Sequence, residues 1–125
     1  MAAAKFKPGR FALLVDYNKV QLDGSSDLIM PMDPILSKLK AFNIVVPDKE
    51  YNGHCTKEII ESWEWMKKNQ HSPVAVVYST IKGKGISFTE NNYKWHGATI
   101  DRDSFEKGIA ELQAGVNLIC EPDEQ

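Results

Sequence analysis

Residues Pro73-Val-Ala-Val-Val-Tyr-Ser79 are the most strand-like segment of the chain. The segment is a continuous apolar run rich in β-branched residues, which is typical of a strand buried on both faces in a parallel sheet. A second run of this kind, Phe11-Ala-Leu-Leu-Val15, follows the turn signal Pro8-Gly9. We therefore predict that these two strands lie side by side in one parallel sheet.

Three segments outside these strands have apolar residues at helical spacing. The first opens at Asp33-Pro34, where Asp is expected to cap the helix and Pro to take its first position. The second runs from about Thr56 to Asn69, and the third from Asp103 to Gln113. In the third helix, Asp103 and Glu106 are the expected capping pair.

The remaining apolar run, Asn43-Ile-Val-Val-Pro47, is predicted as a further short strand, and Asn52-Gly53 as a turn. The resulting order of strand, helix, strand, helix, strand, loop and helix predicts an α/β fold with a mostly parallel sheet. Three strands make a narrow sheet for this class. Either the chain is incomplete or something pairs with the edge of its sheet.

Composition excludes several classes of function. The chain has 125 residues, enough for one domain, and its 15 Lys and Arg are scattered among 17 Asp and Glu without a basic stripe. This charge pattern argues against nucleic acid and membrane partners. Cys55 and Cys120 lack metal spacing and are interpreted as reduced thiols. Together with an N-terminus that lacks the apolar stretch of a signal peptide, this predicts a cytoplasmic protein.

Two polar clusters follow predicted strands, where open α/β sheets bind their ligands. The cluster Thr80-Ile-Lys-Gly-Lys-Gly85, with Trp95-His-Gly97 further on, combines cations with glycines that let backbone approach closely, which suits an anion. The cluster from Asp16 to Gly24 offers a carboxylate, an amide oxygen and loop carbonyls, which suit Mg²⁺. A metal beside a cationic loop is what a diphosphate group needs.

These clusters also carry a family resemblance. Asp16-Tyr-Asn-Lys-Val-Gln-Leu-Asp-Gly24 resembles the second half of the thiamine diphosphate motif of transketolases. The resemblance runs from about Ala2 to Leu112 and implies the three-layer α-β-α thiamine diphosphate-binding fold, here incomplete. Other segments resemble family signatures in the same order: Met30-Pro-Met-Asp-Pro34, Asn52-Gly-His54, Thr80-Ile-Lys-Gly-Lys-Gly-Ile86 and Tyr93-Lys-Trp-His-Gly97.

The resemblance implies roles for five residues. Asn18 matches the family Asn whose side-chain oxygen binds Mg²⁺ and which touches the diphosphate, and Val20 matches a position whose backbone carbonyl binds the same ion. Leu22 matches an apolar residue near the cofactor. Lys82 matches a position that is Lys in some members, where it lies near cofactor and substrate. His96 matches the His that approaches both cofactor and sugar, and it is the candidate catalytic residue.

Taken alone, the polar residues of this set have simpler interpretations. An Asn after a strand is usually a turn residue, as Asn18 would then be. Lys82 could be a solvated loop charge, and His96 a hydrogen-bonded structural residue. Only the family context favours ligand contact for them.

The chain also departs from the family pattern. The family motif begins with Gly-Asp-Gly, whose Asp is a ligand of Mg²⁺, and the residues before Asn18 contain no such sequence. The pyrimidine-binding domain with its catalytic Glu has no counterpart either. The resemblance therefore identifies residues 1–125 as the C-terminal part of a transketolase N-terminal cofactor domain, with residues 114–125 expected to fray.

Transketolases use thiamine diphosphate and Mg²⁺ to transfer a two-carbon ketol unit from a ketose phosphate to an aldose phosphate. The resemblance implies this chemistry, a partner in the form of a pyrimidine-binding domain or subunit, and an oligomeric full enzyme. We expect the isolated chain to be inactive. Two alternatives stay open: a true small subunit that completes its site with other chains, and a non-catalytic α/β module that acts through protein contacts.

Overall fold

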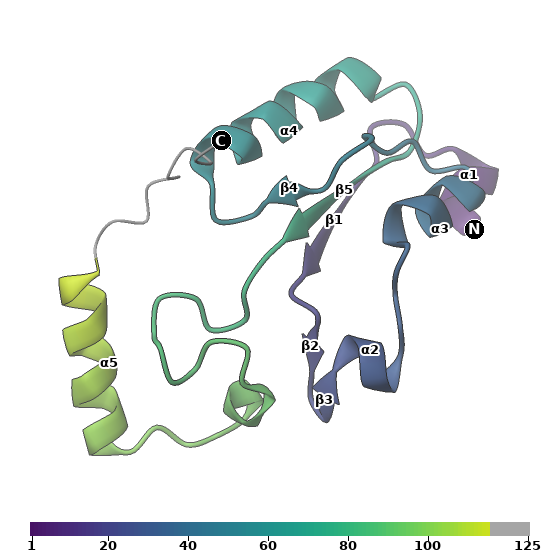
Figure 1. Cartoon of the computed structure of the whole chain (residues 1–125). Helices are drawn as coiled ribbons and strands as arrows, with labels where there is room; N and C mark the ends of the chain where they lie inside the picture. Colours follow the sequence, from purple (N-terminus) through teal and green to yellow (C-terminus); the bar gives the residue numbers. More distant parts are fainter. Residues whose placement is uncertain (116–125) are drawn as a thin grey trace. The chain divides into compact units, whose positions relative to one another are not determined.

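The computed structural model describes residues 1–115 of the chain (Figure 1). Its described residues divide into two compact units. Residues 1–17 and 32–79 form the sheet unit, and residues 18–31 and 80–115 form the loop unit. In chain order the elements are α1 (Ala2–Phe6), β1 (Ala12–Tyr17), β2 (Val20–Gln21), β3 (Gly24–Ser25), α2 (Ser26–Ile29), α3 (Ile35–Ala41), β4 (Tyr51–Asn52), α4 (Thr56–Asn69), β5 (Val74–Ser79), the 3₁₀ helix η1 (Tyr93–His96) and α5 (Arg102–Ala114).

The main sheet belongs to the sheet unit and has the strand order β1-β5-β4. All three strands are parallel. Ala12 pairs with Val74 and Tyr17 with Ser79, so β1 and β5 are in register over their whole length. This confirms that the two apolar runs of the sequence are neighbours in one parallel sheet.

The sheet unit has helices on both faces of the sheet. Alternate residues of β5 point to opposite faces. Val74 and Val76 pack with Met66 of α4, whereas Val77 packs with Ile35 of α3. Helix α1 adds Ala3 and Ala4 to the side of α3. These layers confirm the predicted three-layer α-β-α arrangement, with its core on the buried residues 74–77 of β5.

A buried polar contact joins α4 to β5. The Ser62 hydroxyl on α4 is fully buried and lies 2.7 Å from the Ile59 carbonyl oxygen, to which it donates. It also lies 2.6 Å from the hydroxyl of Tyr78 on β5. Since a hydroxyl has one proton to donate, the Tyr78 hydroxyl is the donor in this second contact.

The third strand of the sheet is not the one expected from the sequence. Residues 43–47 form no strand, and only Val45 makes an isolated bridge to Val74. The third strand is Tyr51–Asn52, and the turn predicted at Asn52-Gly53 begins one residue later, at Gly53. Asn43 has a left-handed φ of 58° and Pro47 has no N–H to donate, so regular pairing does not extend from Val45 to the ends of this run. Its Ile44 and Val46 are nevertheless buried, whereas Val45 is 37% exposed.

Helix α4 has the predicted bounds, whereas the other two helices begin elsewhere. Helix α3 begins at Ile35, because Pro34 takes the N-cap position and not the first helical one. Helix α5 begins at Arg102, and its N-cap is Asp101, whose Oδ1 accepts from the Ser104 N–H at 2.7 Å. The predicted capping pair of this helix is therefore wrong. Its Glu106 is instead bonded to the Arg102 guanidinium at 2.8 Å.

Two further expectations concern the cysteines and the C-terminal tail. Cys55 is buried and is not a free thiol, so the expectation of a reduced thiol is wrong at this position; Cys120 lies outside the described residues. Residues up to Ala114 belong to α5, and residues 116–125 of the predicted frayed tail lie outside the described residues too. Within residues 1–115, no helix is long and apolar enough to cross a membrane.

Candidate functional site

All five residues with expected roles belong to the loop unit. Asn18, Val20 and Leu22 lie in its first segment, and Lys82 and His96 in its second. The residues that precede the two segments, Tyr17 and Ser79, are register partners in the sheet. The two segments therefore follow the carboxyl ends of two adjacent strands, as predicted for the two polar clusters.

Asn18 begins a tight turn into the β2–β3 hairpin. Its Oδ1 accepts from the Val20 N–H at 2.9 Å, and Lys19 between them has a left-handed φ of 57°. Strands β2 and β3 are antiparallel, with Leu22 at the tip and 61% exposed. The turn interpretation of Asn18 thus holds for its conformation. An amide oxygen has two lone pairs, so one remains for a ligand.

The Lys82–Glu90 loop folds around a glycine. Gly83 has a φ of 75°, and a Cβ at this position would lie 2.5 Å from the carbonyl oxygen of Thr89. The Thr89 hydroxyl lies 2.8 Å from the Gly83 carbonyl oxygen, and the Asn91 N–H donates to the Lys82 carbonyl at 2.9 Å. The backbone at Gly83 and the backbone at Thr89 approach so closely that position 83 requires glycine. This approach and the Asn91 hydrogen bond fix the backbone of Lys82.

The two lysines of the loop have different surroundings. Lys84 is 3.7 Å from the Glu90 carboxylate, which also accepts from the Gly85 N–H at 3.0 Å. Glu90 therefore partly neutralises Lys84. Lys82 is half-buried and is anchored through its backbone carbonyl.

His96 ends the short helix η1 and is exposed. The helix is capped by Asn92, whose Oδ1 accepts from the Lys94 N–H at 3.1 Å. The neighbouring Trp95 ring packs against Phe88 with ring centroids 5.2 Å apart. Helix η1 is in contact with β2, which contains Val20. The structure therefore brings the segments of Val20 and His96 together within one unit.

The donor set matches part of what a magnesium ion needs. The Asn18 amide and the Val20 carbonyl both offer neutral oxygens in one turn, and oxygen is the ligand that Mg²⁺ prefers. Among residues 1–115, no group of three or more His, Cys, Asp and Glu side chains could hold a metal ion. These two oxygens would be at most part of a magnesium site, and the other ligands would have to come from elsewhere.

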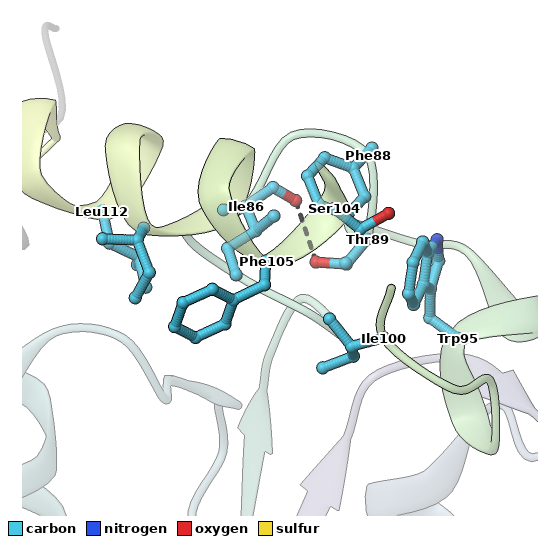
Figure 2. Close-up of a pocket in the computed structure, with 10 residues that line it drawn as sticks. Ile86, Phe88, Thr89, Trp95, Ile100, Ser104, Phe105 and Leu112 are labelled. Atoms are coloured by element: carbon cyan, nitrogen blue, oxygen red, sulfur yellow. Dashed lines mark hydrogen bonds between the residues drawn. The ribbon is translucent and has the colours of Figure 1, made fainter. Parts of the chain in front are cut away.

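The loop unit also contains an apolar pocket that the sequence analysis did not predict (Figure 2). None of the five expected residues lines it. It lies between one face of α5 and the loop that follows Gly85, where Gly108 packs beside Ile86 and Phe88. The helical spacing of Phe105, Ile109 and Leu112 was the one sequence feature that could have indicated this pocket, because all three line it. The main apolar residues of the lining are Ile86, Phe88, Trp95, Ile100, Phe105 and Leu112.

A carboxylate on α5 holds the same loop. Glu111 accepts from the Ser87 N–H at 2.6 Å and from the Ser87 hydroxyl at 2.8 Å. These hydrogen bonds, the backbone bond first, lower the pKa of Glu111 below its ordinary value. The contact joins residues 24 positions apart, and no local pattern of the sequence indicated it.

Comparison with known proteins places these features in a family. Residues 1–117 match the family model described as "Transketolase, thiamine diphosphate binding domain". The chain is 36% identical over 115 residues to the 6-deoxy-6-sulfo-D-fructose transketolase subunit of a Clostridium species, covering 89% of this chain and 41% of that protein. It is 32% identical to an apulose-4-phosphate transketolase subunit from Actinobacillus succinogenes, with 90% and 40% covered.

A solved structure has the same fold. The crystal structure of a transketolase from Campylobacter jejuni superposes with a TM-score of 0.76 at 24% identity, over 90% of this chain and 17% of that one. This chain spans about two-fifths of the length of the two bacterial subunits. The family model covers nearly the whole chain, and so the chain belongs to the transketolase family, as part of its thiamine diphosphate-binding domain.

Proposed function

We propose that this chain supplies the diphosphate and magnesium side of a thiamine diphosphate site in a ketol-transferring enzyme. That enzyme moves a two-carbon ketol unit from a ketose phosphate to an aldose phosphate. The observation that carries the proposal is the family match over residues 1–117, within which the Asn18 turn and the Lys82 loop belong to one compact unit.

Three residues of the β2–β3 hairpin would hold the cofactor and its metal. The Asn18 side-chain oxygen and the Val20 carbonyl bind Mg²⁺, and the exposed Leu22 offers an apolar contact to the cofactor. Thiamine diphosphate, when bound, supplies the carbon nucleophile that cleaves the ketose. Asn18 also keeps its turn through the Val20 N–H, so the two metal ligands are positioned by one hydrogen bond.

Two residues of the second segment, Lys82 and His96, would contact the diphosphate and the substrate. Lys82 places a positive charge beside the diphosphate, on a backbone fixed by Gly83 and Asn91. His96 is the catalytic residue. It would lie close to the sugar and the diphosphate and form a hydrogen bond with the sugar oxygen at the reacting carbon. Its exposure on η1 leaves the imidazole accessible to a substrate.

The proposed enzyme needs polypeptide beyond these residues. Two of the similar proteins are named as transketolase subunits and are more than twice as long as this chain. We infer that a metal-binding carboxylate and a pyrimidine-binding domain or subunit complete the site, in a cytoplasmic oligomer. The isolated chain is then inactive and binds the cofactor poorly, because two neutral oxygens are too few ligands for Mg²⁺. Titration calorimetry that measured micromolar affinity for the chain alone would contradict this.

The roles separate in an enzyme assembled from this chain and the missing parts of a family member. Asn18→Ala should weaken cofactor binding by about 10–100-fold, since it removes a metal ligand. His96→Ala should leave cofactor binding intact and lower turnover by about 10²–10³-fold. Lys82→Ala should be milder than either, and Lys84→Ala, whose charge Glu90 already balances, is its matched control.

The assay is ketol transfer between sugar phosphates over a titration of thiamine diphosphate, with cofactor binding measured separately by calorimetry. An unchanged cofactor requirement for Asn18→Ala would refute the magnesium role. Full turnover of His96→Ala at saturating cofactor would make that residue structural. An assembly that folds but neither binds cofactor nor turns over would favour the non-catalytic module.

A further inference from the structure

The helix that carries His96 is too short to hold itself. Helix η1 is a single turn of 3₁₀ helix, and so short a helix has little stability of its own. Its residues Tyr93, Lys94 and His96 are exposed, whereas Trp95 is half-buried. The orientation of His96 therefore depends on what holds Trp95 and the start of the turn.

The Trp95 ring is held by Phe88. The ring centroids lie 5.2 Å apart and the ring planes are inclined by 58°, a tilted geometry that aromatic pairs favour. Both rings line the apolar pocket of the loop unit (Figure 2). A 3₁₀ helix has about three residues per turn, so successive side chains leave it about 120° apart. Once Trp95 is fixed against Phe88, the direction of the His96 Cα–Cβ bond is fixed as well.

A second link joins the same two segments through the backbone. Asn92 donates from its side-chain Nδ2 to the Phe88 carbonyl oxygen at 3.3 Å. The Oδ1 of the same amide accepts from the Lys94 N–H at 3.1 Å and caps the start of η1. The Trp95 N–H donates to the Asn92 carbonyl at 3.2 Å. One half-buried side chain thus ties the first turn of η1 to the backbone of Phe88.

Helix α5 in turn supports Phe88. The Lys107 ammonium lies 5.0 Å from the centroid of the Phe88 ring, within the range of a cation–π contact. Gly108 is the buried residue of the helix, and a Cβ at this position would lie 3.8 Å from the Phe88 Cζ. The ring therefore lies against α5 at this point. All of these residues belong to the loop unit, so the contacts run from α5 through Phe88 to η1 within one unit.

We propose that Phe88 is the positioning residue of His96. Its ring fixes Trp95 and its carbonyl fixes Asn92, and the two contacts together hold the backbone of His96 at the end of η1. Phe88 acts through His96 and does not contact the substrate itself. The effect of Phe88 on turnover rests on the proposed function, whereas its effect on the orientation of His96 does not.

A purely structural role for Phe88 predicts a different result. Phe88 would then be one apolar side chain of the pocket among others, and its loss would loosen the loop unit without a specific effect on His96. Phe105 on α5 provides the comparison, because it lines the same pocket. Phe105→Leu removes a ring from the lining but leaves the Phe88–Trp95 pair and the Asn92 hydrogen bonds in place, so it is the matched control.

The first experiment uses the full 125-residue chain and measures His96 directly. Backbone ¹⁵N relaxation gives the order parameter of His96, which Phe88→Leu should lower from about 0.85, the value of rigid backbone, to below about 0.6. Hydrogen exchange at the Lys94 and Trp95 amides should accelerate at least about ten-fold, because the local turn opens. Phe105→Leu should leave the order parameter and both exchange rates as in the parent chain.

Variants of Asn92 test the second link and guard against a misfolded Phe88→Leu chain. Asn92→Ala removes the cap of η1 and the donor to the Phe88 carbonyl, so the order parameter of His96 should fall here too. Asn92→Ser keeps an oxygen that can cap the turn and should bring exchange at Lys94 back toward the parent rate. If Phe88→Leu also loses protection at the Asn91 amide, which closes the Lys82 loop, the Asn92 pair decides the question.

The second experiment uses the assembled enzyme and combines two substitutions. Phe88→Leu should lower turnover by about 10–100-fold through misplacement of His96, with cofactor binding unchanged in calorimetry. In a His96→Ala background, Phe88→Leu should lower turnover no further. A residue that acts only through the imidazole has no effect once the imidazole is gone, and so the two losses should not add as free energies.

Two results would overturn the proposal. The first is a His96 backbone that stays as ordered in Phe88→Leu and Asn92→Ala as in the parent chain. The second is a pair of turnover losses that multiply, because Phe88 would then act on the loop and not through His96. Unchanged turnover of His96→Ala alone would instead disprove the catalytic role of His96, and the relaxation measurement would then decide by itself whether Phe88 positions this residue.

Discussion

The sheet unit and the loop unit are stabilised in different ways. In the sheet unit, Val74 to Val77 are at most 2% exposed, and apolar side chains cover both faces of β5. In the described part of the loop unit, Gly108 is the one buried residue. Its conformation depends on single contacts, such as those of Gly83 and Glu111. The candidate residues lie in the loop unit, whose conformation is held by a few specific contacts and not by a buried core. Binding and catalytic residues are commonly found on such loops.

The largest expected effect is in the sheet unit. Met66 is 5% exposed, so Met66→Ala should lower the free energy of unfolding by about 2–5 kcal/mol through lost burial and a cavity. Ile60→Ala on the same helix removes a side chain that is 58% exposed, and it should have little effect. Urea denaturation followed by circular dichroism measures both. Equal losses from the two variants would contradict the assignment of the core.

The next effect tests whether one backbone position controls the loop unit. Gly83→Ala puts a Cβ against the Thr89 carbonyl at a positive φ, and the backbone strain alone costs about 1–2 kcal/mol. Hydrogen exchange should then accelerate at Asn91, whose N–H closes the loop, while β5 stays protected. Gly97→Ala is the control, because nothing lies within 4 Å of its Cβ position. A Gly83→Ala loop as protected as the parent would disprove the close approach.

A smaller effect should depend on pH. The pKa of Glu111 is lowered by its hydrogen bonds to Ser87, so the contact stabilises the loop above the ordinary carboxyl value of about 4.3. This stabilisation is lost as the pH falls through the lowered value in the folded state. The Ser87 amide resonance should therefore shift at acidic pH, and Glu111→Gln should remove that shift. A parent resonance that does not move with pH would exclude the contact.

The smallest expected effect concerns the start of α5. Asp101→Ala removes the acceptor of the Ser104 N–H and should fray the first turn of the helix. Asp101→Asn keeps an acceptor and should restore the turn. Amide exchange at Ser104 separates the two variants. Fraying caused instead by Asp103→Ala would return the cap to the position predicted from sequence.

Apolar runs and helical spacing predicted the regular elements of the sheet unit. The runs at β1 and β5 and the helix Thr56–Asn69 were found in this way, although β1 is mostly exposed. Ile44 and Val46 are buried as well, but only Val45 between them forms a bridge to β5. An apolar run therefore does not determine which backbone groups pair.

The candidate site was accessible from sequence only where it is local. Asn18, Val20 and Leu22 lie in one short hairpin, and a contiguous motif identified them. The contact of Glu111 with Ser87 and the apolar pocket of α5 depend on residues far apart in the chain. The capping residue of α5 was missed by two positions, because Asp101 and Asp103 both precede a helical pattern and only one is aligned with the N–H of Ser104.

The hydroxyl pair of Ser62 and Tyr78 constrains how this sequence can change over evolutionary time. Ser62→Ala alone deprives the Tyr78 hydroxyl of its buried acceptor, and Tyr78→Phe alone withdraws a donor from Ser62. Each single step should cost more than the two together, since replacing both partners of a buried hydrogen bond can be nearly neutral. These positions should therefore covary among relatives as Ser with Tyr or Ala with Phe. The intermediate pairs, Ala with Tyr and Ser with Phe, would be rare. The orientation of α4 against the sheet at this contact would then change only when both residues change.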